Sequence, residues 1–298
     1  MKKICVLIVL ALIFTTCSAS AQEQRLTGTD SFRFTLIDGG TAYRVSVGTA
    51  TAGVVNIPAY YRPDTRSSYL PVTEISEGAF RERENITAIT IPSTVTYIRN
   101  RAFQKCTSLT SVIIPVGVTR IGDSAFAECT SLASVTIPVG VTVIFSDTFN
   151  YCTRLTSIVI PVGVTHIGDN AFRDCYSLTS IIIPEGVTYI GDGAFLVQVK
   201  DENLTSITIP STVTNIGVRA FYGRTGITSI TIPSSVTKIG REAFHDWTAS
   251  QTINVEGHAN RTSADRAWGS EWRMEQYVGR NNQWQNRNIS AQINYLGQ

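Results

Sequence analysis

The chain has 298 residues, of which 16% are charged, and its 25 basic and 23 acidic residues give a formal net charge of +2. Lys2 and Lys3 are the only charged residues before position 22, so the remainder is electrically balanced. Because no basic patch or run stands out, nucleic acid and anionic membrane surfaces are excluded as expected partners.

Residues 1–21 have the features of an export signal. Lys2 and Lys3 give a positive start, an apolar run follows over residues 4–14, and Ala19-Ser20-Ala21 is a small-residue cleavage site. The apolar run is too short to span a bilayer as a permanent helix. We therefore expect a signal peptide over 1–21 and a secreted or cell-surface protein.

Cys17 permits a second interpretation, in which it carries the lipid of an outer-membrane lipoprotein. The preceding Phe14-Thr15-Thr16 is a poor match to the small residue usual before such a cysteine. We favour cleavage after Ala21, with lipidation of Cys17 as the alternative. Membrane attachment is expected only through that lipid anchor.

Residues 22–54 are predicted to form an N-terminal cap. The segments 32–36 and 43–47 alternate apolar and polar residues like strands, and Asp38-Gly39-Gly40 between them is a hairpin signal. An uncovered first repeat would expose core and a free sheet edge. We expect the hairpin to cover it.

One pattern repeats from residue 55 to about 256. Proline recurs in an Ile-Pro pair, at first with a constant step of 23 residues, and a phenylalanine follows eleven residues behind each. The prolines are Pro92, Pro115, Pro138, Pro161, Pro184, Pro210 and Pro233. A fixed period of this length is the signature of a solenoid.

One repeat illustrates the physics. In a strand, side chains alternate between faces, so Val112 and Ile114 point inward while Ser111 and Ile113 point outward. Pro115 has no amide hydrogen for a neighbouring ladder and ends the strand. The chain then returns across the opposite side, where a phenylalanine fills the interior. So short a repeat cannot bury two apolar faces alone and must stack on the next one, with its strands in a parallel sheet.

The repeated Cys-x-x-Leu-x-x-Val-x-Ile-Pro-x-x-Val-x-x-Ile-Gly-x-x-Ala-Phe resembles the Treponema-type leucine-rich repeat of the BspA-like surface proteins, over roughly residues 55–255. The resemblance implies a leucine-rich-repeat solenoid of the α/β type, mostly β and irregular. Its parallel sheet would lie on the concave face, with β caps at both ends. The resemblance also implies a bacterial adhesin for other cells or for host matrix proteins such as fibronectin and fibrinogen.

Two insertions interrupt the period, and insertions in a solenoid go to loops. About eleven extra residues lie near 60–70, and three more lie within 196–203. The first loop is rich in tyrosine and arginine, and we expect it to pack its tyrosines on the cap. A contact site for a partner is the alternative. The residues concerned are Tyr60, Tyr61, Arg62, Arg66 and Tyr69.

Residues 257–298 differ in composition and are predicted to form a C-terminal cap, with a closing strand over 289–296. All four tryptophans of the chain fall in its last 52 residues. They are Trp247, Trp268, Trp272 and Trp284. We expect the indoles to cover the open end of the phenylalanine series, and an aromatic binding surface is the alternative.

Four cysteines share one repeat position, three residues after the phenylalanine. They are Cys106, Cys129, Cys152 and Cys175. Neighbouring turns would bring them within disulfide distance, but identical positions point the same way and not toward each other. We therefore expect buried free thiols. Arg83, Arg224 and Trp247 hold equivalent places, so the position does not require sulfur.

No catalytic or metal-binding constellation stands out. His166 lies in a column whose residue type changes from repeat to repeat, and His245 beside an aspartate fits a solvated pair. Asp123, Asp169 and Asp192 recur at one bend, where we expect each to bond its own backbone. Because nucleophile-elbow, zinc-protease and phosphate-loop motifs are lacking, we predict no enzyme, no cofactor and no metal.

The outward rows of the predicted sheet carry no charge, and in the middle repeats they expose aliphatic side chains. A contiguous apolar patch usually marks an interaction site, although β-branched residues are also simply good strand formers. The candidate ligand-binding residues are Ile113, Val116, Val139, Val159, Val162 and Ile182.

The sequence therefore predicts an exported leucine-rich-repeat protein that binds protein ligands through its uncharged sheet face. The alternative is a structural module of the cell envelope that associates with itself through that face. The ligand, the oligomeric state and the choice between the sheet face, the 60–70 loop and the tryptophan-rich tail do not follow from the sequence.

Overall fold

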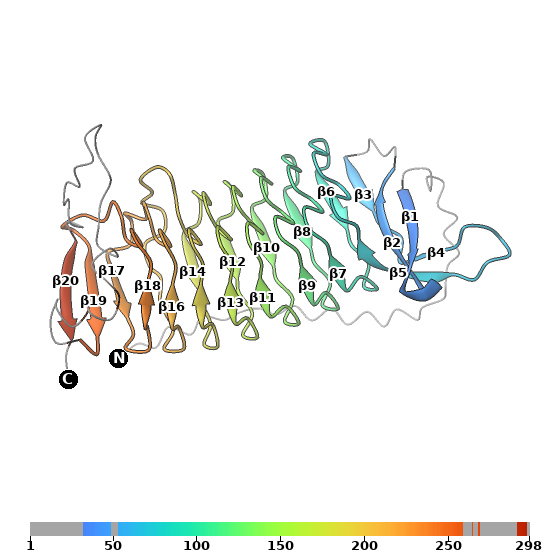
Figure 1. The fold of residues 1–298 in the computed structure, drawn as a ribbon. Helices are drawn as coiled ribbons and strands as arrows, with labels where there is room; N and C mark the ends of the chain where they lie inside the picture. Colours follow the sequence, from blue (N-terminus) through green and yellow to red (C-terminus); the bar gives the residue numbers. More distant parts are fainter. Residues whose placement is uncertain (1–31, 49–52, 259–263, 265–267, 269–290, 297–298) are drawn as a thin grey trace, which may run out of the picture.

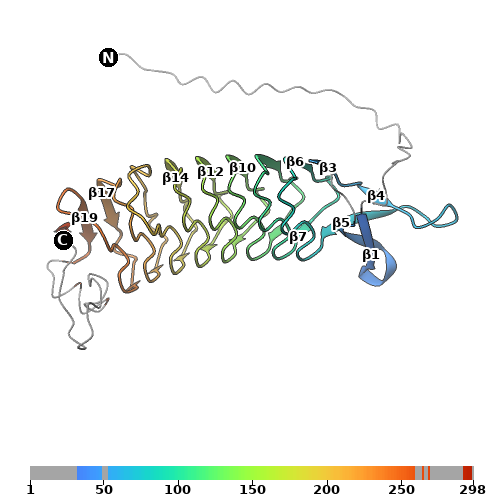
Figure 2. The same cartoon turned by 90° about the horizontal axis from the view of Figure 1, so that it is seen from above.

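The computed structural model describes residues 32–48, 53–258, 264, 268 and 291–296. Over these residues the chain winds into an elongated solenoid of stacked turns, with β1 near one end and β20 at the other (Figure 1). From above, the turns lie one behind another between β3 and β17 (Figure 2). The predicted signal peptide and Cys17 lie outside the described residues. In the described part, no helix is long and apolar enough to cross a membrane.

The predicted parallel sheet forms the first side of the coil, with one short strand from each turn. Equivalent residues of successive repeats pair with one another, so that Ser134 pairs with Ser111 in the preceding turn and with Ser157 in the next. Proline, close behind, ends the strand because it cannot donate to the ladder. The strands are β3 (Val54–Asn56), β6 (Ala88–Thr90), β8 (Ser111–Ile113), β10 (Ser134–Thr136), β12 (Ser157–Val159) and β14 (Ser180–Ile182).

A second parallel ladder, which the sequence analysis did not predict, forms the next side. It consists of two-residue strands and is interrupted between β9 and β11. The strands are β7 (Tyr97–Ile98), β9 (Arg120–Ile121), β11 (Val143–Ile144), β13 (His166–Ile167), β15 (Tyr189–Ile190), β16 (Asn215–Ile216) and β18 (Lys238–Ile239).

The third side consists of turns that also bond to their neighbours. The amide of Phe126 donates to the carbonyl of Thr148 at 2.9 Å, and the amide of Glu128 donates to Asn150 at 2.7 Å. Residues on either side of the phenylalanine, such as Ser124 and Glu128, have positive φ values of 54° and 60°. Hydrogen bonds between turns therefore connect all three sides of the coil.

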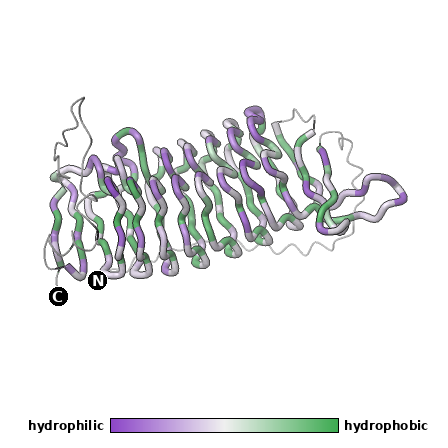
Figure 3. Tube along the Cα trace, viewed as in Figure 1, coloured by the Kyte–Doolittle hydropathy of each residue, from purple (hydrophilic) through white to green (hydrophobic). Residues whose placement is uncertain are grey.

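The phenylalanines stack along the interior, which confirms that Phe126 is a core residue. Their rings are fully buried, and neighbouring centroids lie 5.1–5.7 Å apart. The stack comprises Phe80, Phe103, Phe126, Phe149, Phe172, Phe195, Phe221 and Phe244. Hydrophobic stretches recur at equivalent places in successive turns (Figure 3).

An antiparallel hairpin precedes the first turns, as predicted. It consists of β1 (Phe32–Ile37), the short helix η2 (Asp38–Gly40) and β2 (Ala42–Val47). β2 pairs in parallel with β5 (Leu70–Ile75), which also pairs with β7, so the hairpin extends the second ladder. The insertion forms a second hairpin from β4 (Tyr60–Tyr61) and β5, which projects from this end of the molecule (Figure 1).

The first ladder stops at β14. A ladder of three strands follows at the C-terminal end of the described chain. These are β17 (Ser229–Ile232), β19 (Thr252–Glu256) and β20 (Gln292–Leu296), all parallel. In the turn between, Ile207 and Ile209 are buried and Ser206 is exposed, as in a strand, yet residues 204–209 join no ladder. This interruption follows the insertion within 196–203.

Candidate functional site

The outward row of the first sheet places aliphatic side chains next to one another. Parallel pairing aligns Ile113 with Thr136, Thr136 with Val159, and Val159 with Ile182. Each of these four residues is exposed, whereas the residue before it is buried. The alternation predicted from the sequence is therefore present, and this outward row is aliphatic in three of four turns.

A second aliphatic row lies just past the prolines, at Val116, Val139 and Val162. Together with the three aliphatic residues of the sheet row, these valines form a surface that we call the apolar strip. Its members are Ile113, Val116, Val139, Val159, Val162 and Ile182, each between 68% and 84% exposed. The six predicted candidate residues are therefore all exposed.

The chemistry of the apolar strip is limited to nonpolar contact. None of its side chains titrates. The row of valines past the prolines ends where Glu185 replaces valine in the next turn, and the Glu185 carboxylate accepts a hydrogen bond from the Ser211 hydroxyl at 3.3 Å. Covering one Val or Ile side chain completely contributes about 1.5–3 kcal/mol. Such a surface can hold a partner but cannot move a proton or bind a metal.

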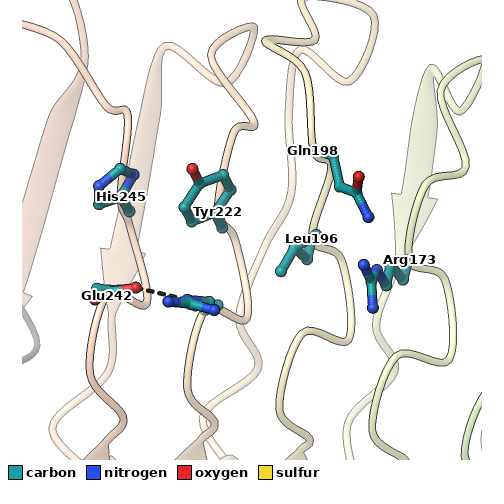
Figure 4. A pocket seen from close by; sticks show the side chains of 7 residues that line it. Arg173, Leu196, Gln198, Tyr222, Glu242 and His245 are labelled. Carbon is teal, nitrogen blue, oxygen red and sulfur yellow. Dashed lines mark hydrogen bonds and ion pairs between the residues drawn. The ribbon is translucent and has the colours of Figure 1, made fainter. Parts of the chain in front are cut away.

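A pocket of about 300 Å³ lies on the turn side of the coil, in none of the strands. Figure 4 shows Arg173 and Gln198 at one side, Tyr222 and His245 at the other, and Leu196 between them. The other two lining residues are Arg219 and Glu242. No motif signalled this pocket, because its residues come from four successive turns.

Buried carboxylates fix both sides of the pocket. Asp174 accepts hydrogen bonds from the backbone amide of Gln198 at 2.9 Å and from Arg173 Nε at 3.3 Å. Glu242 accepts one from Arg219 Nε at 2.5 Å. Both carboxylates are almost fully buried, whereas the side chains of Arg173 and Arg219 are 33% and 47% exposed.

An aromatic pair forms the remaining wall, and it corrects the prediction for one histidine. His245 is 6% exposed and stacks on Tyr222, with ring centroids 4.5 Å apart, so it is not a solvated residue. Its Nδ1 lies 3.3 Å from Asp246 Oδ1 without a well-formed hydrogen bond. Burial and the nearby Asp246 carboxylate raise the pKa of Tyr222. His166, by contrast, is exposed as predicted.

The four repeated cysteines are free and buried, as expected. Each thiol donates to the carbonyl of the phenylalanine one turn earlier, with Sγ to oxygen distances of 3.1–3.2 Å. Burial raises the pKa of Cys106 and of Cys175 to about 12. The thiols are therefore protonated at neutral pH and act as donors, not as nucleophiles or metal ligands.

Two residues that replace cysteine at this repeat position also donate from their side chains. Arg224 Nε donates to the carbonyl of Phe195 at 2.7 Å, and Trp247 Nε1 donates to that of Phe221 at 3.1 Å. The position does not require sulfur, as the sequence indicated, but in these turns it holds an N–H or S–H group. That shared property was visible in the sequence and was missed.

The three-residue insertion supplies the counter-charge for Arg224. Its Asp201 bonds to Arg224 Nη1, and both side chains are almost completely buried. Nη2 of the same guanidinium has no partner within the described residues. The interior of this turn therefore contains an ion pair where four other turns have a thiol.

The projecting hairpin is only partly packed. Tyr61 stacks on Phe34 with ring centroids 3.8 Å apart, as expected of a loop that packs on the cap. Tyr60 and Tyr69 are more than half exposed, and the guanidinium of Arg62 lies 4.3 Å from the ring centre of Tyr69. The tip of the hairpin remains a candidate contact surface.

Two of the four tryptophans can be placed. Trp247 packs edge-on against Phe244 at 5.2 Å, so it covers the end of the phenylalanine stack. Trp268 is also buried. Trp272 and Trp284 lie outside the described residues, and the prediction for them stands as a prediction.

The repeated acidic bend corrects a further expectation. Asp123, Asp169 and Asp192 do not bond their own backbone, because each carboxylate accepts the amide of the next turn, at 2.7–3.2 Å. Their function in the described structure is to join turns. No cluster of side chains suited to a metal ion occurs in the described part of the chain.

The sequence matches the family model described as "BspA type Leucine rich repeat region", with six copies, over residues 73–200 and 198–267. A crystal structure of a leucine-rich-repeat protein from T. pallidum is 26% identical, with a TM-score of 0.51, over 72% of this chain and 86% of that one. A leucine-rich-repeat protein from Bacteroides ovatus is 23% identical, with a TM-score of 0.53, over 78% of this chain and 64% of that one, and this likeness concerns the fold alone. No curated protein matches the sequence.

Proposed function

Because the chain belongs to the BspA-type leucine-rich-repeat family, whose repeats are protein-interaction modules and not enzymes, we propose that it binds a protein ligand through the apolar strip. We propose further that it is exported through residues 1–21 to the cell surface or beyond, and that it acts as an adhesin. The observation that carries the proposal is the exposure, between 68% and 84%, of six aliphatic side chains in two rows.

The exposure of the strip favours binding over a purely structural explanation. Good strand propensity alone would be satisfied by threonine, which occupies the same row at Thr90, Thr136 and Thr231. At Ile113, Val159 and Ile182 the row instead holds aliphatic groups, and leaving exposed aliphatic groups in water is unfavourable. A partner that covers these groups removes that cost.

The first experiment measures binding of residues 22–298 to immobilised fibronectin and fibrinogen, the ligand class implied by the family resemblance. The test variant is Ile113→Lys/Val159→Lys/Ile182→Lys. The matched control is Thr90→Lys/Thr208→Lys/Thr231→Lys, which adds the same three charges to the same row outside the strip. Both variants should retain the melting behaviour of the wild type, since all six positions are exposed.

Saturable binding that the strip variant loses by about tenfold or more, and that the control variant keeps, supports adhesion through the strip. Equal loss in both variants would mean that charge alone weakens binding. If even the wild type binds neither ligand, these two ligands are discarded.

A second candidate function is self-association within the cell envelope. One feature favours it, namely that the strip repeats with the spacing of the turns, so a second copy offers rows of matching period. Sedimentation of pure residues 22–298 should then show oligomers that grow with concentration and disappear in Val139→Lys. A monomer at all concentrations would eliminate this function.

A further inference from the structure

The groups of the pocket that still lack hydrogen-bond partners in the described structure are mainly N–H donors. Arg173 and Arg219 each use only Nε for a neighbouring carboxylate. A guanidinium has five N–H groups, so the terminal Nη groups of both arginines have no partner in the described part of the chain. The same holds for the side-chain amide of Gln198, whose only bond is through its backbone.

The acceptors around the pocket are already engaged. Asp174 bonds to Arg173 and to the backbone of Gln198. Glu242 lies 2.5 Å from Arg219 Nε and 3.4 Å from Arg241 Nε. A ligand must therefore bring its own acceptor oxygens, because the pocket has few to offer in return.

The charges of the pocket favour a monoanion. Three arginines (173, 219 and 241) lie near three carboxylates (174, 242 and 246), so the numbers of acidic and basic side chains are equal. A single carboxylate disturbs this balance less than a doubly charged phosphate would. Its planar pair of oxygens also fits the fork of a guanidinium, which is already held in position through Nε.

The shape of the pocket favours a side chain presented by a polypeptide. Its volume of about 300 Å³ is at the small end of the range for ligand sites, and its lining residues follow one another along the stack of turns. Leu196 and the stacked pair of Tyr222 and His245 offer nonpolar contact beside the donors. An extended chain can run along the turns while one carboxylate enters the pocket.

We propose that this pocket binds the carboxylate of an aspartate or glutamate side chain from a polypeptide partner. Arg173, Gln198 and Arg219 donate to the carboxylate oxygens, and Leu196 and Tyr222 contact the methylene groups behind it. None of these residues belongs to the apolar strip. The pocket is thus a second contact site, independent of the proposed function of the strip.

The test uses two pools of fluorescent heptapeptides with randomised flanks, one with a central glutamate and the other with a central glutamine. Binding to residues 22–298 is followed by fluorescence anisotropy. The glutamate pool should bind about tenfold more tightly or better, because the glutamine amide lacks the charge that strengthens bonds to the two arginines.

Gln198→Glu places a carboxylate among the donors and should weaken binding of the glutamate pool by about tenfold through like-charge repulsion. Val199→Glu is the matched control, since it adds the same charge on the exposed neighbour outside the lining. It should change binding less than about twofold. Neither change touches the core, so thermal melting should be unaffected.

Equal affinity for the two pools, or full binding by Gln198→Glu, would overturn the proposal. Oligosaccharides of glucuronate form a third arm. Binding to these oligosaccharides and not to the peptides would overturn the assignment to a polypeptide, because the carboxylate ligand would then belong to a sugar. Failure here leaves the strip unaffected, because the lysine variants of the strip test that surface separately.

Discussion

The regular turns and the turns around the three-residue insertion fill the same interior position in different ways. In the regular part, a neutral thiol such as that of Cys152 donates to the carbonyl of Phe126. Beyond the insertion, Arg224 donates to the carbonyl of Phe195, and Asp201 neutralises its charge. The first ladder is continuous across the regular turns and is absent at residues 204–209.

This difference shows what each kind of buried donor requires. The thiol of Cys152 adds a second hydrogen bond to the Phe126 carbonyl, which also accepts the backbone amide of Cys129 at 3.3 Å. Because a thiol is neutral, it can occupy the position without further change. A guanidinium can occupy it only together with a carboxylate, because an unpaired buried charge is far more costly. The arginine and the insertion are therefore one compensated change.

Removing the carboxylate should have the largest effect. Asp201→Ala leaves Arg224 buried without a counter-charge and should lower the free energy of unfolding by about 3–5 kcal/mol, measured by urea titration. Asp201→Ala/Arg224→Met removes both charges and should recover most of that loss. If the double variant is as unstable as the single one, the two residues do not compensate each other.

A deletion in the regular stack should be of similar size. Phe126→Ala removes a fully buried ring that stacks on Phe103 and Phe149 and should cost about 3–5 kcal/mol. Differential scanning calorimetry measures the change. An unaltered melting temperature would contradict the interior position of this ring, and the exposed Thr136→Ala provides the control.

Removing one thiol should have the smallest effect. Cys152→Ala removes the side-chain donor of the Phe126 carbonyl, which keeps the backbone amide of Cys129, and opens a small cavity. We expect a loss of about 1–2 kcal/mol in the free energy of unfolding. Cys152→Ser restores a donor and should be less destabilising if the hydrogen bond is what matters. Equal loss in both variants, compared by urea titration, would assign the effect to packing of the sulfur.

Local patterns were sufficient to predict the main architecture. The 23-residue step, the proline at the strand end and the buried phenylalanine predict a stacked coil with a parallel sheet. The exposure of residues such as Ile113 and Val139 follows from strand alternation and from the prolines. These features depend on neighbours along the chain, and for that reason the sequence reveals them.

Features that depend on contacts between turns could not be predicted from these local patterns. A Cβ on Gly168 would lie 2.7 Å from the carbonyl carbon of Phe145 in the preceding turn. Glycine is therefore required at this bend, and only the distance to the preceding turn shows it.

The repeat, the interior and the uncharged outer face could be predicted, because each is set by period and by residue type. The pairing of Asp201 with Arg224 and the pocket between Arg173 and His245 became evident only in the folded chain. Those groups stand far apart in the sequence. They meet because turns stack at a fixed spacing, and that spacing is a property of the folded coil.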